Sequence, residues 1–122
     1  MDPRLRYNLV IVHPIHGVIG SCGINVESLE NRITSISYFI NKCFWGKGYG
    51  TEIVSRLISY GFEDLNMTRI TATYDPRNNA SWKVMENGMK REGFLRHDRF
   101  IRGEWRDTCI CSILLSERVR DS

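Results

Sequence analysis

The chain has 122 residues, of which 42% are apolar, enough for one small domain with a single core. A net charge of +3 at pH 7, spread along the chain, suits an anionic ligand but does not indicate nucleic acid. No apolar run approaches the roughly 18 residues of a membrane helix. We therefore expect a single cytoplasmic domain over residues 1–122, with no nucleic-acid or membrane partner.

Three strands are predicted first. Residues 7–13 and 17–25 are apolar and β-branched, and the short turn between them makes these two strands antiparallel. A third strand is predicted over 33–40. Within it and just after it, we expect Tyr38, Phe39 and Phe44 to pack in the core.

A glycine-rich segment follows the third strand. Residues 44–52 read FWGKGYGTE, with Gly46, Gly48 and Gly50 at alternate positions. Glycines let backbone N–H groups approach a ligand closely. A helix is predicted over 51–62, and the free N–H groups and dipole of a helix N-terminus favour an anion. The segment therefore predicts a phosphate-binding loop.

The C-terminal half of the chain contains three further strands and one helix. The predicted elements are a strand at 67–74, a turn at 75–79, a helix at 79–87, and a hairpin of strands 91–101 and 105–115. The order is β-β-β-α-β-α-β-β. It predicts an α/β fold with a mixed, mostly antiparallel sheet and a central parallel βαβ crossover, where the glycine loop lies.

The cysteines and histidines do not form a metal motif. The four cysteines are Cys22, Cys43, Cys109 and Cys111. We expect them to be buried, reduced thiols because none forms a CxxC pair. His13, His16 and Cys22 fit no established zinc-ligand spacing, so no metal is expected.

Two common phosphate-loop classes do not fit the glycine segment. A nucleoside-triphosphate loop places its lysine after the last glycine, whereas Lys47 lies between Gly46 and Gly48. A dinucleotide fold requires Gly-x-Gly-x-x-Gly within repeated βαβ units, and this chain has Gly-x-Gly-x-Gly within one.

A third class fits. Residues 45–52 (WGKGYGTE) resemble the acetyl-coenzyme A pyrophosphate loop of the GNAT superfamily of N-acetyltransferases, and in particular its ribosomal-protein N-terminal acetyltransferase branch. Residues 75–93 (DPRNNASWKVMENGMKREG) and 102–107 (RGEWRD) are similar to that branch's second helix and last hairpin. The three matches occur in the family's order.

The resemblance implies acetyl-CoA as co-substrate and direct acetyl transfer to an amine, with no metal. The acceptor would be a protein N-terminus or a small polyamine-like or aminoglycoside amine. The pyrophosphate would lie on Trp45, Gly46, Lys47, Gly48, Tyr49, Gly50 and Thr51. Phe39 and Ile40 would pair with the pantetheine arm, and the thioester would lie in a gap between the third and fourth strands. A backbone N–H near Ile40 would stabilise the oxyanion.

Two residues of the second helix complete the implied site. Asn78 and Ser81 would bind the arm near the sulfur, and Ser81, the one catalytic residue assigned, would hydrogen-bond or protonate the leaving thiolate. The base is unassigned, because Ser35 or its neighbour stands where many members carry a glutamate, and a serine is no base at neutral pH. His97 is a candidate for that role.

The largest departure from the family is at the start of the chain. Members begin with a strand and a helix pair that wall the acceptor site, whereas this chain is short there and reaches the second family strand by Tyr7. We therefore expect an exposed apolar sheet face and a homodimer. The alternative interpretation is a truncated, catalytically idle module of the same fold that binds CoA or serves oligomerisation.

Overall fold

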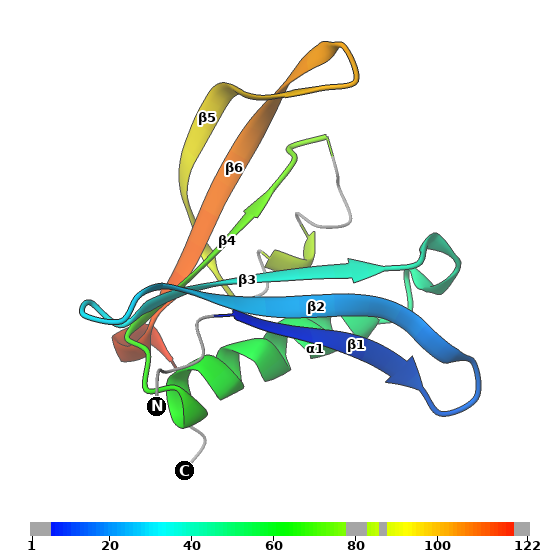
Figure 1. Cartoon of the computed structure of the whole chain (residues 1–122), viewed down its shortest axis with the longest axis horizontal. Coiled ribbons are helices and arrows are strands. Elements are labelled where there is room, and N and C mark those ends of the chain that lie inside the picture. The colour runs from blue at the N-terminus through cyan, green and yellow to red at the C-terminus, as the bar shows by residue number, and fades with distance from the viewer. Residues whose placement is uncertain (1–5, 78–82, 86–87, 119–122) are drawn as a thin grey trace.

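The computed structural model describes residues 6–77, 83–85 and 88–118. They form a six-stranded sheet in the order β1-β2-β3-β4-β6-β5, with one long helix, α1 (Tyr49–Ser59), along one face (Figure 1). The strands are β1 Arg6–His13, β2 Gly17–Ser28, β3 Ile33–Ile40, β4 Arg69–Tyr74, β5 Lys90–Ile101 and β6 Glu104–Leu114. All neighbouring strands are antiparallel except β3 and β4. The predicted mixed sheet with one parallel crossover is confirmed.

Three elements differ from their predicted bounds by two residues or more. Helix α1 begins at Tyr49, two residues early, and continues into a π-helical turn, Tyr60–Asp64. Strand β2 extends to Ser28 across a bulge, which lets Ser28 pair with Ile33. Strand β4 begins at Arg69 instead of Met67, because the Met67 N–H donates to the Gly61 carbonyl and holds that residue against the helix end. The predicted helix at 79–87 lies mostly outside the described residues, of which 83–85 are helical.

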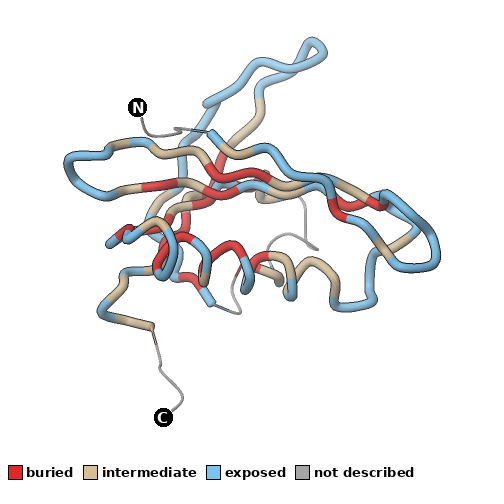
Figure 2. Tube along the Cα trace, turned by 60° about the horizontal axis from the view of Figure 1, so that its bottom comes forward, coloured by how far each residue is buried: buried red, intermediate tan, exposed pale blue. Residues whose placement is uncertain are grey.

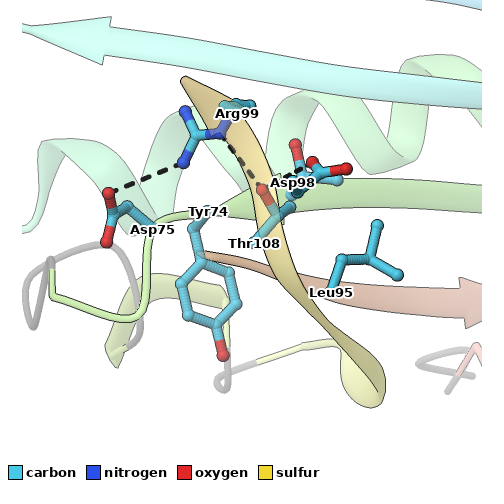
Figure 3. Close-up of a pocket in the computed structure, with 7 residues that line it drawn as sticks. Tyr74, Asp75, Leu95, Asp98, Arg99 and Thr108 are labelled. Atoms are coloured by element: carbon cyan, nitrogen blue, oxygen red, sulfur yellow. Dashed lines mark hydrogen bonds and ion pairs between the residues drawn. The ribbon is translucent and has the colours of Figure 1, made fainter. Parts of the chain in front are cut away.

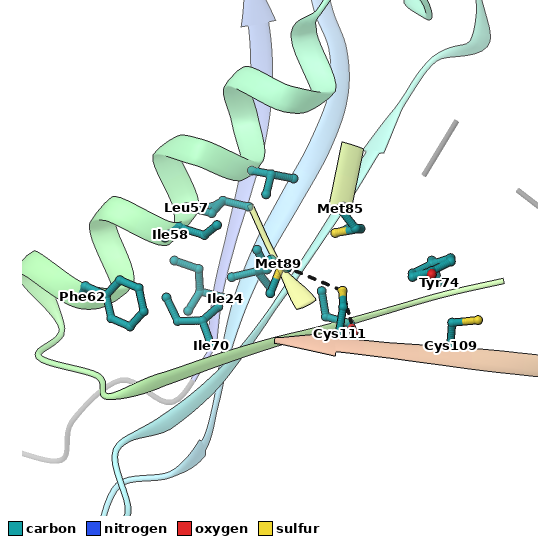
Figure 4. Close-up of a cluster of buried hydrophobic side chains, with 13 residues drawn as sticks. Ile24, Leu57, Ile58, Phe62, Ile70, Tyr74, Met85, Met89, Cys109 and Cys111 are labelled. Atoms are coloured by element: carbon teal, nitrogen blue, oxygen red, sulfur yellow. Dashed lines mark hydrogen bonds between the residues drawn. The ribbon is translucent and has the colours of Figure 1, made fainter. Parts of the chain in front are cut away.

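The core lies between α1 and the sheet. Figure 4 shows Leu57, Ile58 and Phe62 of this helical segment beside Ile24 and Ile70 of the strands. The contact is close at Gly61, where an added Cβ would meet the Ile70 side chain at 2.7 Å. The core continues toward β6 through Met85, Met89, Cys109 and Cys111. This packing fixes α1 against the parallel strand pair.

Strands β3 and β4 pair over a short distance. Their register covers only Ile33 to Ser35 opposite Arg69 to Thr71, and beyond it the two strands diverge (Figure 1). The last five residues of β3 therefore have no partner in β4, and the separation of these two strands that the family resemblance implies is present.

The other face of β1, β2 and β3 is uncovered in the described part of the chain. Val10, Val12, Val18 and Phe39 are each more than 60% exposed, and Figure 2 shows the exposed segments along these strands. The prediction that Phe39 packs in the core was wrong, because Tyr38 and Ile40 turn toward α1 and the strand alternation sends Phe39 outward.

The cysteines are all free thiols, and Cys109 and Cys111 are buried as expected. Cys43 is exposed, contrary to the prediction, because it lies in a short 3₁₀ turn (Lys42–Phe44) with no buried residue. Among the described residues, no helix is both long and apolar enough to cross a membrane.

Candidate functional site

The glycine loop places the N-terminus of α1 at the C-terminal end of β3. Gly46 and Gly48 adopt left-handed backbone angles, with φ of 78° and 84°. Gly48 is the N-cap residue and offers no side chain to cap the helix. The intrahelical bonds begin with the Glu52 N–H donating to the Gly48 carbonyl, so the N–H groups of the first turn point outward without a helical partner. This is an anion-binding geometry.

Trp45 fastens the loop to the strand before it. Its indole Nε1 donates a hydrogen bond to the Ile40 carbonyl at 2.7 Å. Asn41 holds the intervening turn, since its side chain accepts the Cys43 N–H and its own N–H donates to the Ile19 carbonyl. The loop is therefore held in one position relative to β3 before any ligand binds.

The strand alternation decides which backbone groups face the gap. The Asn41 N–H points to β2, and the Phe39 carbonyl lies against Gly20 of β2. By alternation the backbone groups of Tyr38 and Ile40 face the opposite side, where the Trp45 indole meets the Ile40 carbonyl. The Ile40 backbone therefore faces the unpaired side of β3, whereas the Phe39 backbone faces β2.

Aromatic rings at the β1–β2 turn pack against the glycine loop, a contact that the sequence did not indicate. The rings of His13 and His16 lie 4.8 Å apart, and His16 packs on Phe44 at 5.3 Å. His13 also meets Tyr49, the first residue of α1, at 5.6 Å between ring centroids. These partners are about 30 residues apart in the chain, so no local pattern could reveal them.

The side chain of Tyr38 lies over the first turn of the helix. An added Cβ on Gly50 would meet Val84 at 3.1 Å and the Tyr38 ring at 3.5 Å. The third glycine of the motif is therefore required by close packing, whereas Gly46 and Gly48 are required by their backbone angles.

A cavity of about 190 Å³ lies where β4 ends, beside β5 and β6. Its lining residues are Thr73, Tyr74, Asp75, Leu95, Asp98, Arg99 and Thr108 (Figure 3). The Thr108 hydroxyl donates to Asp98 Oδ2 at 2.8 Å and accepts from Arg99 Nε at 3.1 Å. The cavity therefore combines an apolar wall with a fixed carboxylate.

Asp75 is held by guanidinium groups. The Arg106 side chain donates to its Oδ2 at 2.7 and 2.8 Å, and Arg99 lies 3.5 Å away. The Arg77 N–H donates to Oδ1 at 2.9 Å. Burial raises the pKa of Asp75, but the bonds from Arg77 and Arg106 outweigh it and lower that pKa below its usual value. The Asp75 carboxylate is thus ionised and links the end of β4 to the β5–β6 hairpin.

A carboxylate that the sequence did not indicate lies beside Ser35. The Ser35 hydroxyl donates to Glu27 Oε1 at 2.7 Å, and the Asn25 amide donates to the same oxygen at 2.9 Å. Ser35 is the last β3 residue paired with β4. Glu27 thus brings a carboxylate from β2 to the point where the strands part, and only the β2–β3 register could reveal it.

The remaining predicted site residues fall elsewhere. His97 lies in the β5 bulge with φ of 50° and stacks on Trp105, 5.6 Å between ring centroids, and is absent from the residues that line the cavity. Lys47 is exposed within the loop. Asn78 and Ser81 lie outside the described residues.

Comparisons with known proteins agree with this geometry. Residues 2–90 match the profile of the acetyltransferase (GNAT) domain. The chain is 38% identical over 109 residues to the uncharacterised N-acetyltransferase p20 of Bacillus licheniformis, covering 88% of this chain and 61% of that protein. It is 29% identical over 79 residues to the ribosomal protein uS5 alanine N-acetyltransferase of Escherichia coli, covering 64% of this chain and 41% of that protein.

A solved structure shares the fold. The spermidine N-acetyltransferase of Vibrio cholerae in complex with CoA and spermine superposes with a TM-score of 0.84 at 24% identity, covering 93% of this chain and 68% of that one. The chain spans about half to three fifths of the length of the curated relatives that it matches first. With the profile matched over most of its residues, the chain belongs to the GNAT acetyltransferase family.

Proposed function

We propose that this chain binds acetyl-CoA and transfers the acetyl group directly to an amine. The observation that carries the proposal is the end of β3–β4 pairing at Ser35, with the helix N-terminus held at the open end of β3. A parallel pair that separates leaves room for an extended arm. An uncapped helix N-terminus next to it supplies donors for a pyrophosphate.

The cofactor site assigned by this proposal is the loop from Trp45 to Thr51 together with Ile40. The N–H groups of Tyr49, Gly50 and Thr51 would receive the pyrophosphate, with Lys47 adding a positive charge. A β3 backbone N–H that faces the gap between Ser35 and Ile40 would stabilise the oxyanion that forms as the amine attacks the thioester carbon. Asn78 and Ser81 remain proposals by family resemblance, with Ser81 returning a proton to the thiolate.

Glu27 is our candidate for the base. An attacking amine must lose its proton, and a carboxylate can accept it directly or through water. Glu27 stands beside Ser35 at the point where β3 and β4 part, on the sheet face away from α1. With this assignment, β2 supplies the carboxylate that many family members carry on β3, where this chain has Ser35.

The test is a calorimetric titration with acetyl-CoA, followed by thiol-release assays with amine acceptors. Saturable binding that is lost in Gly48→Val, with an unchanged circular dichroism spectrum, supports the loop assignment. Acetyl-CoA affinity unchanged in that variant would overturn it. Thiol release that depends on the amine would establish transfer.

The alternative function is a catalytically idle CoA-binding or oligomerisation module. The uncovered apolar face of β1–β3 favours it, because Val10, Val12, Val18 and Phe39 would be covered in a homodimer. Cofactor binding without thiol release for any amine, together with a dimer in analytical ultracentrifugation, would favour this alternative. A monomer with amine-dependent turnover would exclude it.

A further inference from the structure

The cavity at the end of β4 holds a carboxylate with no basic partner of its own. Among the described residues, Asp75 is paired with arginines, whereas Asp98 receives only the neutral Thr108 hydroxyl. Arg99, the nearest cavity arginine in sequence, is directed to Thr108 and Asp75 (Figure 3). The cavity therefore holds one carboxylate, that of Asp98, which no guanidinium group of the described residues contacts directly.

The cavity also lies where a second reactant can approach the gap. Thr73 and Asp75 belong to the end of β4 that has parted from β3. Ile70, Ala72 and Tyr74 turn toward the core under α1, so Thr73 faces the other side of the sheet. The cofactor loop opens at α1, so an acceptor in this cavity would not compete with the cofactor.

The chemistry of a carboxylate limits what Asp98 can bind productively. A negative charge stabilises a neighbouring ammonium and opposes loss of its proton. The reacting nitrogen must be neutral to attack the thioester, so a carboxylate that binds it as an ammonium, without taking its proton as Glu27 is proposed to do, would hold it in the unreactive form. A second positive group on the same molecule has no such conflict.

We propose that Asp98 binds a second cationic group of the acceptor, so that the preferred acceptor is a small diamine or polyamine. This inference rests on the proposed acetyl transfer and specifies its substrate class. The cavity volume, about 190 Å³, admits an ammonium and the carbons next to it, since a water molecule takes about 30 Å³. Leu95 supplies an apolar wall for those carbons.

Three amines of matched length test the proposal. Butylamine, putrescine and γ-aminobutyrate carry the same reacting amine and differ at the far end, which is a methyl, an ammonium or a carboxylate group. The wild-type kcat/KM should be highest for putrescine, about 10-fold or more above butylamine, since charge-assisted hydrogen bonds are worth that factor. γ-Aminobutyrate should be the poorest acceptor.

Variants of Asp98 should change this ranking. Asp98→Asn keeps an acceptor for the Thr108 hydroxyl and should abolish the preference for putrescine over butylamine. Asp98→Lys should favour γ-aminobutyrate. Asp107→Asn is the matched control, since Asp107 lies on the same hairpin but is absent from the residues that line the cavity. It should keep the wild-type ranking. An unchanged ranking in Asp98→Asn would overturn the proposal.

Calorimetry separates failure of this proposal from failure of the proposed function. Wild-type protein that does not bind acetyl-CoA, or that releases no thiol with any amine, would contradict the proposed function. In that case putrescine binding measured directly, with CoA present, decides the role of Asp98. Putrescine binding that weakens about 10-fold in Asp98→Asn supports it. Equal binding by both proteins, or none by the wild type, overturns it.

Discussion

The Trp45 indole donates a hydrogen bond to the Ile40 carbonyl across 2.7 Å, joining the first residue of the glycine loop to the last residue of β3. Both ends of the proposed cofactor site are therefore set by one contact. Ile40 borders the gap, and Trp45 begins the loop that leads to α1. The Asn41 turn and the packing of His16 on Phe44 add to this constraint.

Trp45→Phe keeps most of the ring but removes this donor. We expect acetyl-CoA affinity to fall about 5- to 10-fold, because the bond is worth roughly 1 kcal/mol and the loop becomes less ordered. Calorimetric titration measures the change. Trp105→Phe, an exposed tryptophan on the hairpin, is the control and should bind as the wild type does. Equal affinities for the two variants would contradict the role given to Trp45.

Gly48 is required for its backbone angle rather than for space. An added Cβ would meet nothing within 4 Å, but φ is 84°. Gly48→Ala should therefore destabilise the fold by about 1 kcal/mol and weaken acetyl-CoA binding, while Gly48→Asn should cost less because asparagine tolerates this conformation better. Denaturant unfolding and calorimetry together test both effects. If Gly48→Asn destabilises the fold as much as Gly48→Ala does, the added Cβ and not the backbone angle is the cause of the loss.

Glu27→Gln should lower kcat by about 10- to 100-fold with little change in the KM for acetyl-CoA. Glutamine still accepts the Ser35 hydroxyl bond but cannot take a proton at neutral pH. Steady-state kinetics with a saturating amine measures this change. Glu30→Gln, an exposed glutamate in the turn after β2, is the control. A variant with unchanged kcat would leave the base unassigned.

The Asp75 anchor makes stability depend on pH. Its pKa is lowered in the fold, as burial is outweighed by the bonds from Arg77 and Arg106. A carboxyl with a folded pKa below its unfolded value, about 3.9, stabilises the fold above that pH and ceases to do so as pH falls through the folded pKa.

Asp75→Asn tests this anchor. It should cost about 1 to 2 kcal/mol at neutral pH and almost nothing once the pH falls below the lowered pKa of Asp75 in the folded protein, where the wild-type carboxyl is protonated too. Urea unfolding at a series of pH values measures the difference. A cost that is constant across pH would show that packing, rather than charge, accounts for the contribution of Asp75.

The local patterns of the sequence determined the elements. Alternation over 33–40 and the apolar positions after Thr51 predict a strand and a helix, because side-chain period follows backbone geometry directly. The glycine loop was equally readable, since left-handed angles at Gly46 and Gly48 exclude most other residues. These signals are carried by neighbouring residues.

The tertiary structure alone decided which distant side chains meet. Glu27 reaches Ser35 through the β2–β3 register, and Asp98 reaches Thr108 across a bulged hairpin. The exposure of Phe39 depended on which face α1 covers, and the orientation of the Ile40 backbone depended on the partner strand. Register and helix docking are set by packing between segments far apart in the chain. The sequence by itself determined the glycine loop, and only the fold placed the candidate base and the candidate acceptor site.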